Sequence, residues 1–138
     1  MANFQAKEWL KASYSDLKTI EYMLDDSFLT HMVAFHSQQA IEKSFKAILE
    51  NASIPVPKVH KLETLVSKLN ITLEINYDIL TTLDLLYIES RYPGDMGLLP
   101  NGKPTLNDAK EFYDFAKEIF SQICTILEVT IEELKNNS

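Results

Sequence analysis

Apolar residues recur every three or four positions along most of the chain, which is the spacing of residues on one face of an α-helix. In the first stretch these residues are Leu10, Tyr14, Leu17, Ile20, Met23 and Leu24. Asn3 suits the start of that helix, because its side chain can accept hydrogen bonds from the free N–H groups of the first turn. The pattern predicts helices over about residues 3–26, 30–50, 62–69, 76–90 and 105–134.

Two proline-containing breaks interrupt this pattern. Residues 51–57 include Pro55 and Pro57, which do not fit inside a helix. Residues 91–104 form the longest break and hold three prolines. Long amphipathic helices with short connections predict an all-α fold, an antiparallel up-and-down bundle of four to five helices. We expect a single domain over residues 1–138, with the last few residues, 135–138, frayed.

Composition agrees with a helical domain that has its own core. The chain has 138 residues, of which 46% are hydrophobic, and only three glycines and five prolines, too few for the many turns of an all-β fold. The single Cys124 excludes an internal disulfide and a four-cysteine zinc site. Its place within a helical apolar pattern predicts a small buried hydrophobic side chain.

The charge balance limits the classes of partner. Lysine and arginine number 13 and aspartate and glutamate 20, which gives a net charge of −7. Such a surface disfavours a stand-alone nucleic-acid binder or an anionic membrane as target, although it leaves room for a local basic pocket. The chain has no apolar run of about 18 residues and no basic-then-apolar layout at its start, so we expect a cytoplasmic protein without a membrane partner.

The second helical stretch is apolar or small on several sides, which predicts a helix surrounded by others. Gln38 lies in the middle of its main apolar stripe, where an unpaired amide would be costly. We therefore expect a specific hydrogen-bonding partner for Gln38. Ala40 and Ala47 lie seven residues apart on another face. That face, or the apolar edge of a long helix, is a candidate contact between two copies.

Two segments carry a family resemblance. Residues 35–47 read Phe-His-Ser-Gln-Gln-Ala-Ile-Glu-Lys-Ser-Phe-Lys-Ala, and residues 87–93 read Tyr-Ile-Glu-Ser-Arg-Tyr-Pro. Around them, in order, stand Trp9-Leu10, Asp16-Leu17 and His60-Lys61-Leu62. These segments resemble the HEPN domains (higher eukaryotes and prokaryotes nucleotide-binding), which have a similar Gln-Gln-Ala-x-Glu-Lys-x-x-Lys-Ala run on the second helix and an Arg-Tyr-Pro segment ending a long helix. The resemblance covers nearly the whole chain.

The resemblance implies a helical bundle that forms a homodimer. It also implies a prokaryotic protein that partners a small nucleotidyltransferase in a toxin–antitoxin-like pair. Such a protein would bind nucleotide or RNA and would need no cofactor. Many members are metal-independent ribonucleases with an Arg followed a few residues later by a His. Here no histidine follows Arg91, because His31, His36 and His60 all precede it. We therefore interpret the chain as a binding partner or substrate-recognition subunit. The alternative is a ribonuclease toxin that uses Arg91 in a degenerate or non-standard site.

Four residues are the candidates for nucleotide or phosphate binding, namely Arg91, Tyr92, Tyr87 and Lys43. The guanidinium of Arg91 suits phosphate oxygens, although it could equally stack on Tyr87, one helical turn earlier. Tyr92 would shape a pocket or cover the edge of the core.

Lys43 shares a helix face with His36, whereas Lys46 lies well away from both. The simpler interpretation of these lysines is a helix with solvated tips. The spacing of the histidines does not suit a metal site, and we expect the carboxylates of the last helical stretch to form a solvated surface.

Overall fold

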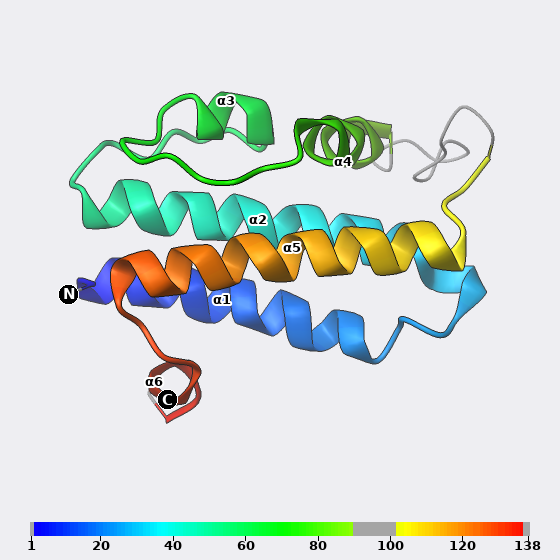
Figure 1. Cartoon of the computed structure of the whole chain (residues 1–138), viewed down its shortest axis with the longest axis horizontal. Coiled ribbons are helices and arrows are strands. Elements are labelled where there is room, and N and C mark those ends of the chain that lie inside the picture. The colour runs from blue at the N-terminus through cyan, green and yellow to red at the C-terminus, as the bar shows by residue number, and fades with distance from the viewer. Residues whose placement is uncertain (1, 90–101, 137–138) are drawn as a thin grey trace.

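The computed structural model describes residues 2–89 and 102–136, and Figure 1 shows these residues as a bundle of helices. The described elements are α1 (Phe4–Glu21), the 3-10 turn η1 (Ser27–Leu29), α2 (Thr30–Asn51), α3 (Leu62–Val66), α4 (Tyr77–Glu89), α5 (Leu106–Leu127) and α6 (Ile131–Asn136). The all-α bundle predicted from the sequence is confirmed. No described helix has the length and apolar character needed to cross a membrane.

The helix starts follow from local side chains. The Asn3 side chain accepts a hydrogen bond from the backbone N–H of Ala6 at 2.8 Å, which confirms the predicted cap of α1. At the start of α5, the Thr105 hydroxyl accepts from the Asp108 N–H at 3.0 Å, and the Asp108 carboxylate accepts from the Thr105 N–H at 2.9 Å. This reciprocal capping box satisfies two of the donors that a helix start leaves free.

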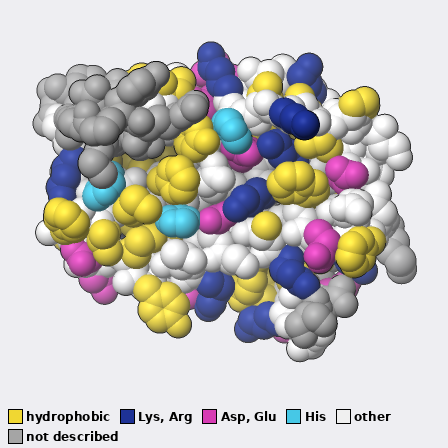
Figure 2. Space-filling view, turned by 180° about the vertical axis from the view of Figure 1, so that it is seen from behind, with side chains coloured by type: hydrophobic (Ala, Val, Ile, Leu, Met, Phe, Trp, Pro, Cys, Tyr) yellow, Lys and Arg dark blue, Asp and Glu magenta, His cyan; other side chains and the backbone are white. Residues whose placement is uncertain are grey.

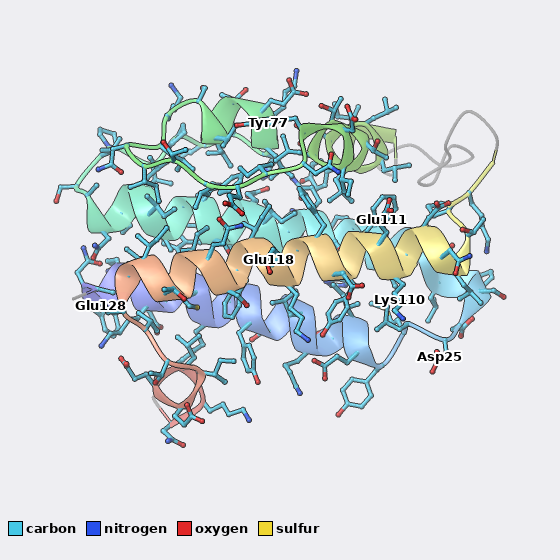
Figure 3. All side chains as sticks on the ribbon, in the orientation of Figure 1. Asp25, Tyr77, Lys110, Glu111, Glu118 and Glu128 are labelled. Atoms are coloured by element: carbon cyan, nitrogen blue, oxygen red, sulfur yellow. The ribbon has the colours of Figure 1, made fainter. Side chains whose placement is uncertain are left out.

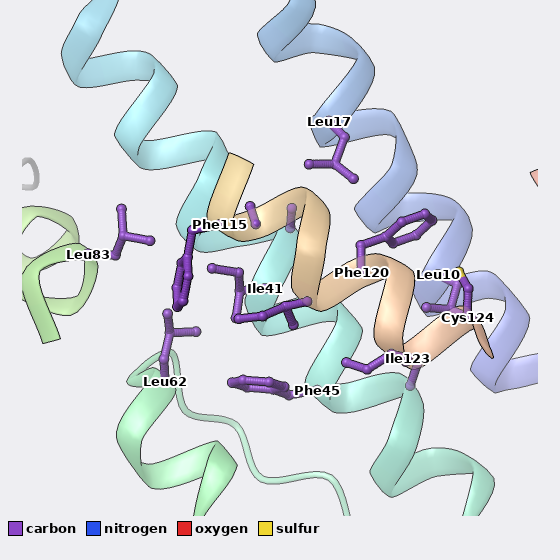
Figure 4. Packing of buried hydrophobic residues seen from close by; sticks show 14 of the residues in the cluster. Leu10, Leu17, Ile41, Phe45, Leu62, Leu83, Phe115, Phe120, Ile123 and Cys124 are labelled. Carbon is purple, nitrogen blue, oxygen red and sulfur yellow. The ribbon is translucent and has the colours of Figure 1, made fainter. Parts of the chain in front are cut away.

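Three long helices form the body of the bundle. In Figure 1, α1, α2 and α5 lie side by side along the long axis, with α1 running opposite to α2 and α5. The α4 helix is seen nearly end-on, so its axis runs across the direction of these three, and it packs mainly on α2, with α3 beside it. Apolar side chains from all of these elements fill the space between them, and Figure 4 labels Leu10, Leu17, Ile41, Phe45, Leu62, Leu83, Phe115, Phe120, Ile123 and Cys124. Burial of Cys124 agrees with the prediction.

Small residues bring α1 and α2 close together. The Ser13 hydroxyl of α1 donates to the Ala40 carbonyl of α2 at 2.7 Å and lies 2.8 Å from the Ser44 hydroxyl. Ala40 and Ala47 are fully buried within one chain. The suggestion that these two alanines form a contact between copies is therefore wrong, because their face is already occupied by the chain's own helices.

The predicted last helix, 105–134, is divided in two. α5 ends at Leu127, and Glu128 adopts the left-handed conformation with φ of 56°. The N–H of Val129 then donates to the Cys124 carbonyl at 2.9 Å, which closes the helix end. After this turn, α6 packs back against α1, and the side chains of Val129 and Leu134 are buried. The free energy gained by burying these two side chains explains why α5 does not continue to residue 134.

Two other boundaries also differ from the prediction. α1 ends at Glu21 rather than near residue 26, and η1 follows it, started by the Asp26 carboxylate accepting from the Phe28 N–H at 2.9 Å. α3 spans only Leu62–Val66. The predicted helices at 30–50 and 76–90 agree with α2 and α4 over the described residues.

Candidate functional site

A polar cluster connects α1 to α2 through Asp16, and we call Asp16, His36 and Lys43 the Asp16 group. The Lys43 ammonium donates to one Asp16 carboxylate oxygen at 2.7 Å, and His36 Nδ1 lies 2.8 Å from the other. An ionised carboxylate only accepts, so Nδ1 carries the proton in this bond. Asp16 itself is buried, whereas His36 and Lys43 are half-buried and reach the surface.

A second cluster repeats this arrangement further along α2. We call it the Glu42 group, and its members are Gln38, Gln39, Glu42, Lys46 and His60. Lys46 donates to Glu42 Oε2 at 2.9 Å, and His60 Nδ1 lies 3.1 Å from Oε1. The side chains of Glu42 and Lys46 are only 5% and 8% exposed, while that of His60 is 54% exposed. Each group therefore contains a lysine, a buried carboxylate and a histidine that reaches the surface.

Gln38 ties this second cluster to the loop before α3. Its amide donates to the His60 backbone carbonyl at 2.7 Å, and its own carbonyl accepts from Gln39 at 2.8 Å. The predicted specific partner of Gln38 is thus found. Because the bond reaches the His60 backbone, it holds the position from which the imidazole meets Glu42.

Aromatic rings connect the two groups. Tyr87 of α4 stacks on Phe35 of α2, with ring centroids 5.7 Å apart and an interplanar angle of 15°. The His60 ring lies 5.5 Å from that of Tyr87, and His36 meets Phe35 edge-on at 5.3 Å. The Lys46 ammonium also contacts a ring, because it sits 5.4 Å from the centroid of Trp9. The rings of Phe35 and Tyr87 thus lead from one outward-facing histidine to the other.

A hollow of about 320 Å³ opens beside these rings, between α4 and the start of α3. His60, Lys61, Thr64, Asp84, Tyr87 and Ile88 are among its lining residues. Asp84 is buried, and its carboxylate accepts from the N–H groups of Leu62 at 2.7 Å and Glu63 at 3.1 Å, so it caps α3. Burial raises the pKa of Asp84, although these two hydrogen bonds act in the opposite direction.

Cationic and histidine side chains gather on the face of the molecule that Figure 2 shows, where lysines, histidines and single carboxylates lie between apolar side chains. On the opposite side, Figure 3 labels Glu111 and Glu118 along α5. Both are exposed, as expected for the carboxylates of the last helical stretch. A chain of net charge −7 thus presents histidines and lysines together on one face. No group of three or more metal-binding side chains occurs in the described residues.

The four residues predicted to bind nucleotide divide into two pairs. Tyr87 and Lys43 belong to one connected set of side chains, joined through Phe35, His36 and Asp16. Arg91 and Tyr92 lie outside the described residues. The simpler interpretation of the lysines is wrong for Lys46, which is buried against Glu42 and Trp9 rather than solvated. Lys43 is partly exposed and is paired with Asp16.

Sequence reasoning assigned no site role to Asp16, Glu42 or His60, although all three stand in the segments that carry the family resemblance. Glu42 and Lys46 are four residues apart, the spacing at which side chains meet on a helix. The spacing of Glu42 and Lys46 is therefore enough to predict their ion pair. The contact of Glu42 with His60 cannot be predicted from spacing, because it depends on the path of residues 52–61 back to α2.

Comparisons with known proteins identify the family and the fold of this chain. The family model for the HEPN domain matches residues 6–127. The archaeal HEPN homologue ST0689 has a similar structure, with 26% identity, a TM-score of 0.65, and coverage of 91% of this chain and 99% of that one. TT1696 from Thermus thermophilus also has a TM-score of 0.65, at 22% identity, with coverage of 86% and 95%. No curated protein matches. Since the family model matches residues 6–127 of the 138 residues, this chain belongs to the HEPN domain family.

Proposed function

We propose that this protein is the HEPN subunit of a two-component, toxin–antitoxin-like assembly with a small nucleotidyltransferase, that it acts there as a homodimer, and that its Asp16 and Glu42 groups bind nucleotide. The observation that carries the nucleotide part is the row of rings Phe35 and Tyr87 between two outward-facing histidines. A nucleotide base can stack on an aromatic face, and protonated imidazoles and lysines bind phosphate oxygens.

The Asp16 group leaves donors for a ligand. Lys43 has three N–H donors, of which one is directed to Asp16. His36 is held through Nδ1, so its Nε2 is turned away from Asp16. A phosphate beside these two side chains would receive hydrogen bonds from Lys43, and from His36 Nε2 when the ring is an imidazolium, without disturbing the carboxylate that positions them. Nucleotide binding suits a subunit that presents substrate to a nucleotidyltransferase.

Pull-down of the tagged chain from its native host tests the pairing, and recovery of a small nucleotidyltransferase is the expected result. Recovery of the chain alone would contradict it.

Nucleotide binding is tested by calorimetry with ATP, where we expect micromolar affinity. Lys43→Gln and Tyr87→Leu should each weaken binding by about tenfold or more. Tyr22→Leu is the matched control, because Tyr22 is an exposed tyrosine at the C-terminal end of α1. Equal binding by all variants would refute the assignment of the site.

The His60–Glu42 pair favours a second candidate function, ribonuclease activity. Glu42 fixes the proton of His60 on Nδ1, which leaves the Nε2 lone pair to act as a base when the ring is neutral. In such cleavage, His60 would take the proton of a ribose 2′-hydroxyl. The freed oxygen would attack phosphorus, and the 5′ oxygen would leave with a proton from water. The products are a 2′,3′-cyclic phosphate and a 5′-hydroxyl.

Incubation of the purified protein with a labelled RNA in EDTA tests this second function. His60→Gln should then abolish cleavage, whereas His31→Gln should not, because His31 contacts Phe28 at the other end of α2. Absence of cleavage by the wild-type protein would remove this candidate and leave the binding function unaffected.

A further inference from the structure

A groove of about 500 Å³ lies along α5, between that helix and the residues at the start of α4. Its floor is apolar and consists of Ile79, Phe115 and Ile119, of which the last two are buried. The side of α5 that lines it extends from Asn107 to Ile119, a span of about 18 Å or three helical turns. We call this feature the α5 groove. None of the residues proposed to bind nucleotide lines it.

Four exposed carboxylates line the α5 groove around this floor, namely those of Glu74, Glu111, Asp114 and Glu118. Lys110 is the one cation among the described lining residues, so four negative charges and one positive charge give a net charge of −3. None of these carboxylates forms an ion pair within the described part of the chain. Lys117 of α5 lies against the Tyr113 ring instead, and the exposed Asp78 adds a further negative charge nearby.

The distribution of these carboxylates identifies the class of ligand. Glu111 and Glu118, both labelled in Figure 3, lie seven residues apart on one side of α5, about 10 Å along the helix. No three metal-binding side chains converge in the described residues, so the charges do not suit a single metal ion. A row of negative charges repels phosphate groups, which argues against nucleic acid and anionic lipid. It attracts an extended cation.

The walls of the α5 groove are held in place by the chain itself. The Gln122 side chain of α5 accepts from the Glu74 N–H at 3.0 Å and donates to the Glu74 carbonyl at 2.9 Å. The Asn76 side chain accepts from the Asp78 N–H at 3.0 Å at the start of α4. These bonds fix the segment before α4 against α5. A ligand would therefore enter a groove that is already formed, without a cost for ordering its walls.

We propose that the α5 groove is a docking surface for a basic amphipathic helix of a partner protein. Apolar side chains on one side of that helix would cover Ile79, Phe115 and Ile119, and lysines or arginines along its edges would pair with Glu111, Glu118 and their neighbours. An amphipathic helix in an apolar groove is a common mode of peptide recognition. Three turns of such a helix match the length of the groove. This surface goes beyond the proposed nucleotide and nucleotidyltransferase functions.

Fluorescence anisotropy with a labelled synthetic peptide tests this surface. The probe is a capped peptide of about 15 residues with leucines at helical spacing and lysines along both edges, and we expect a dissociation constant of about 10 µM. Glu111→Gln combined with Glu118→Gln should raise that constant about tenfold or more. Asp25→Asn combined with Glu132→Gln is the matched control, because it removes two charges from exposed residues outside the groove. An equal loss in the control would overturn the proposal, since binding would then follow net charge alone.

Two further measurements separate a docked helix from a simple cation. A peptide with serine in place of each leucine keeps its charges and should bind at least about tenfold more weakly than the probe, because it cannot cover the apolar floor. Spermidine at about 1 mM should leave the probe bound. Equal binding of the serine peptide, displacement by spermidine, or no binding of the probe by the wild-type protein would each overturn the proposal. The assay contains no nucleotide, so its result is independent of the proposed function.

Discussion

Replacing Lys46 by methionine removes one charge from the Glu42 group while keeping most of the side-chain length. Lys46 and Glu42 form an ion pair of 2.9 Å within α2, and both side chains are more than nine-tenths buried. Removal of one partner from a buried pair leaves an uncompensated charge, which costs roughly 3–5 kcal/mol. His60 also contacts Glu42 and offsets part of this cost. We therefore expect Lys46→Met to lower the free energy of unfolding by about 3 kcal/mol.

The double variant isolates the pair itself. In Glu42→Gln with Lys46→Met neither buried charge is present, so its loss of stability should be smaller than the sum of the two single losses by about 2 kcal/mol. Part of the single Lys46→Met effect is the contact with the Trp9 ring, about 0.5–1 kcal/mol, and this part does not depend on Glu42. The coupling energy between Glu42 and Lys46 therefore does not include the contact with the Trp9 ring.

Urea unfolding followed by circular dichroism gives these energies, and the Lys46→Met melting temperature should fall by roughly 10 °C. Lys18→Met is the control, because Lys18 and Glu21 form a pair of the same 2.9 Å length on the exposed side of α1. Its midpoint should match that of the wild-type protein. Two outcomes would refute the view that burial makes the pair of Glu42 and Lys46 important for stability. One is a double variant whose loss of stability equals the sum of the two single losses, and the other is a control that loses as much stability as Lys46→Met.

Three further predictions concern buried groups. Asp84→Ala leaves the N–H groups that start α3, including that of Leu62, without an acceptor, and should cost about 2 kcal/mol in urea unfolding. Burial and the hydrogen bond to Glu21 raise the pKa of Tyr113 to about 12, so its contribution to stability is present below pH 10 and lost as pH rises toward 12. A spectrophotometric titration should show a tyrosine that ionises last, and Tyr113→Phe should remove it. Burial also raises the pKa of the Cys124 thiol to about 12, so a thiol reagent should react with it only after unfolding.

Helical periodicity was enough to predict α2 and α4, because each buries a regular apolar stripe within the bundle. It missed the end of α5 at Leu127, since nothing in the local spacing marks Glu128 as a left-handed residue. That turn is set by the burial of Val129 and Leu134 as α6 packs on α1, a contact between the two ends of the chain. Patterns within one helix do not contain such information.

The candidate site shows the same division between local and long-range information. The shared face of His36 and Lys43 follows from their positions on one helix, and both meet Asp16. The prediction of a solvated Lys46 is wrong because it considers the lysine without its partner Glu42, four residues earlier on the same helix. The role of His60 depends on the path of the chain after α2, which periodicity does not address.

The packing of α6 back onto α1 has a practical consequence for truncated forms of this protein. The family model ends at residue 127, so a boundary chosen from it would remove α6. Leu134 would no longer cover the side of α1 on which α6 packs, and Lys7 would lose its 3.2 Å ion pair with Glu133. A fragment of the family's length would then expose apolar surface beside its N-terminus, and we expect it to be less soluble than the chain that keeps residues 128–136.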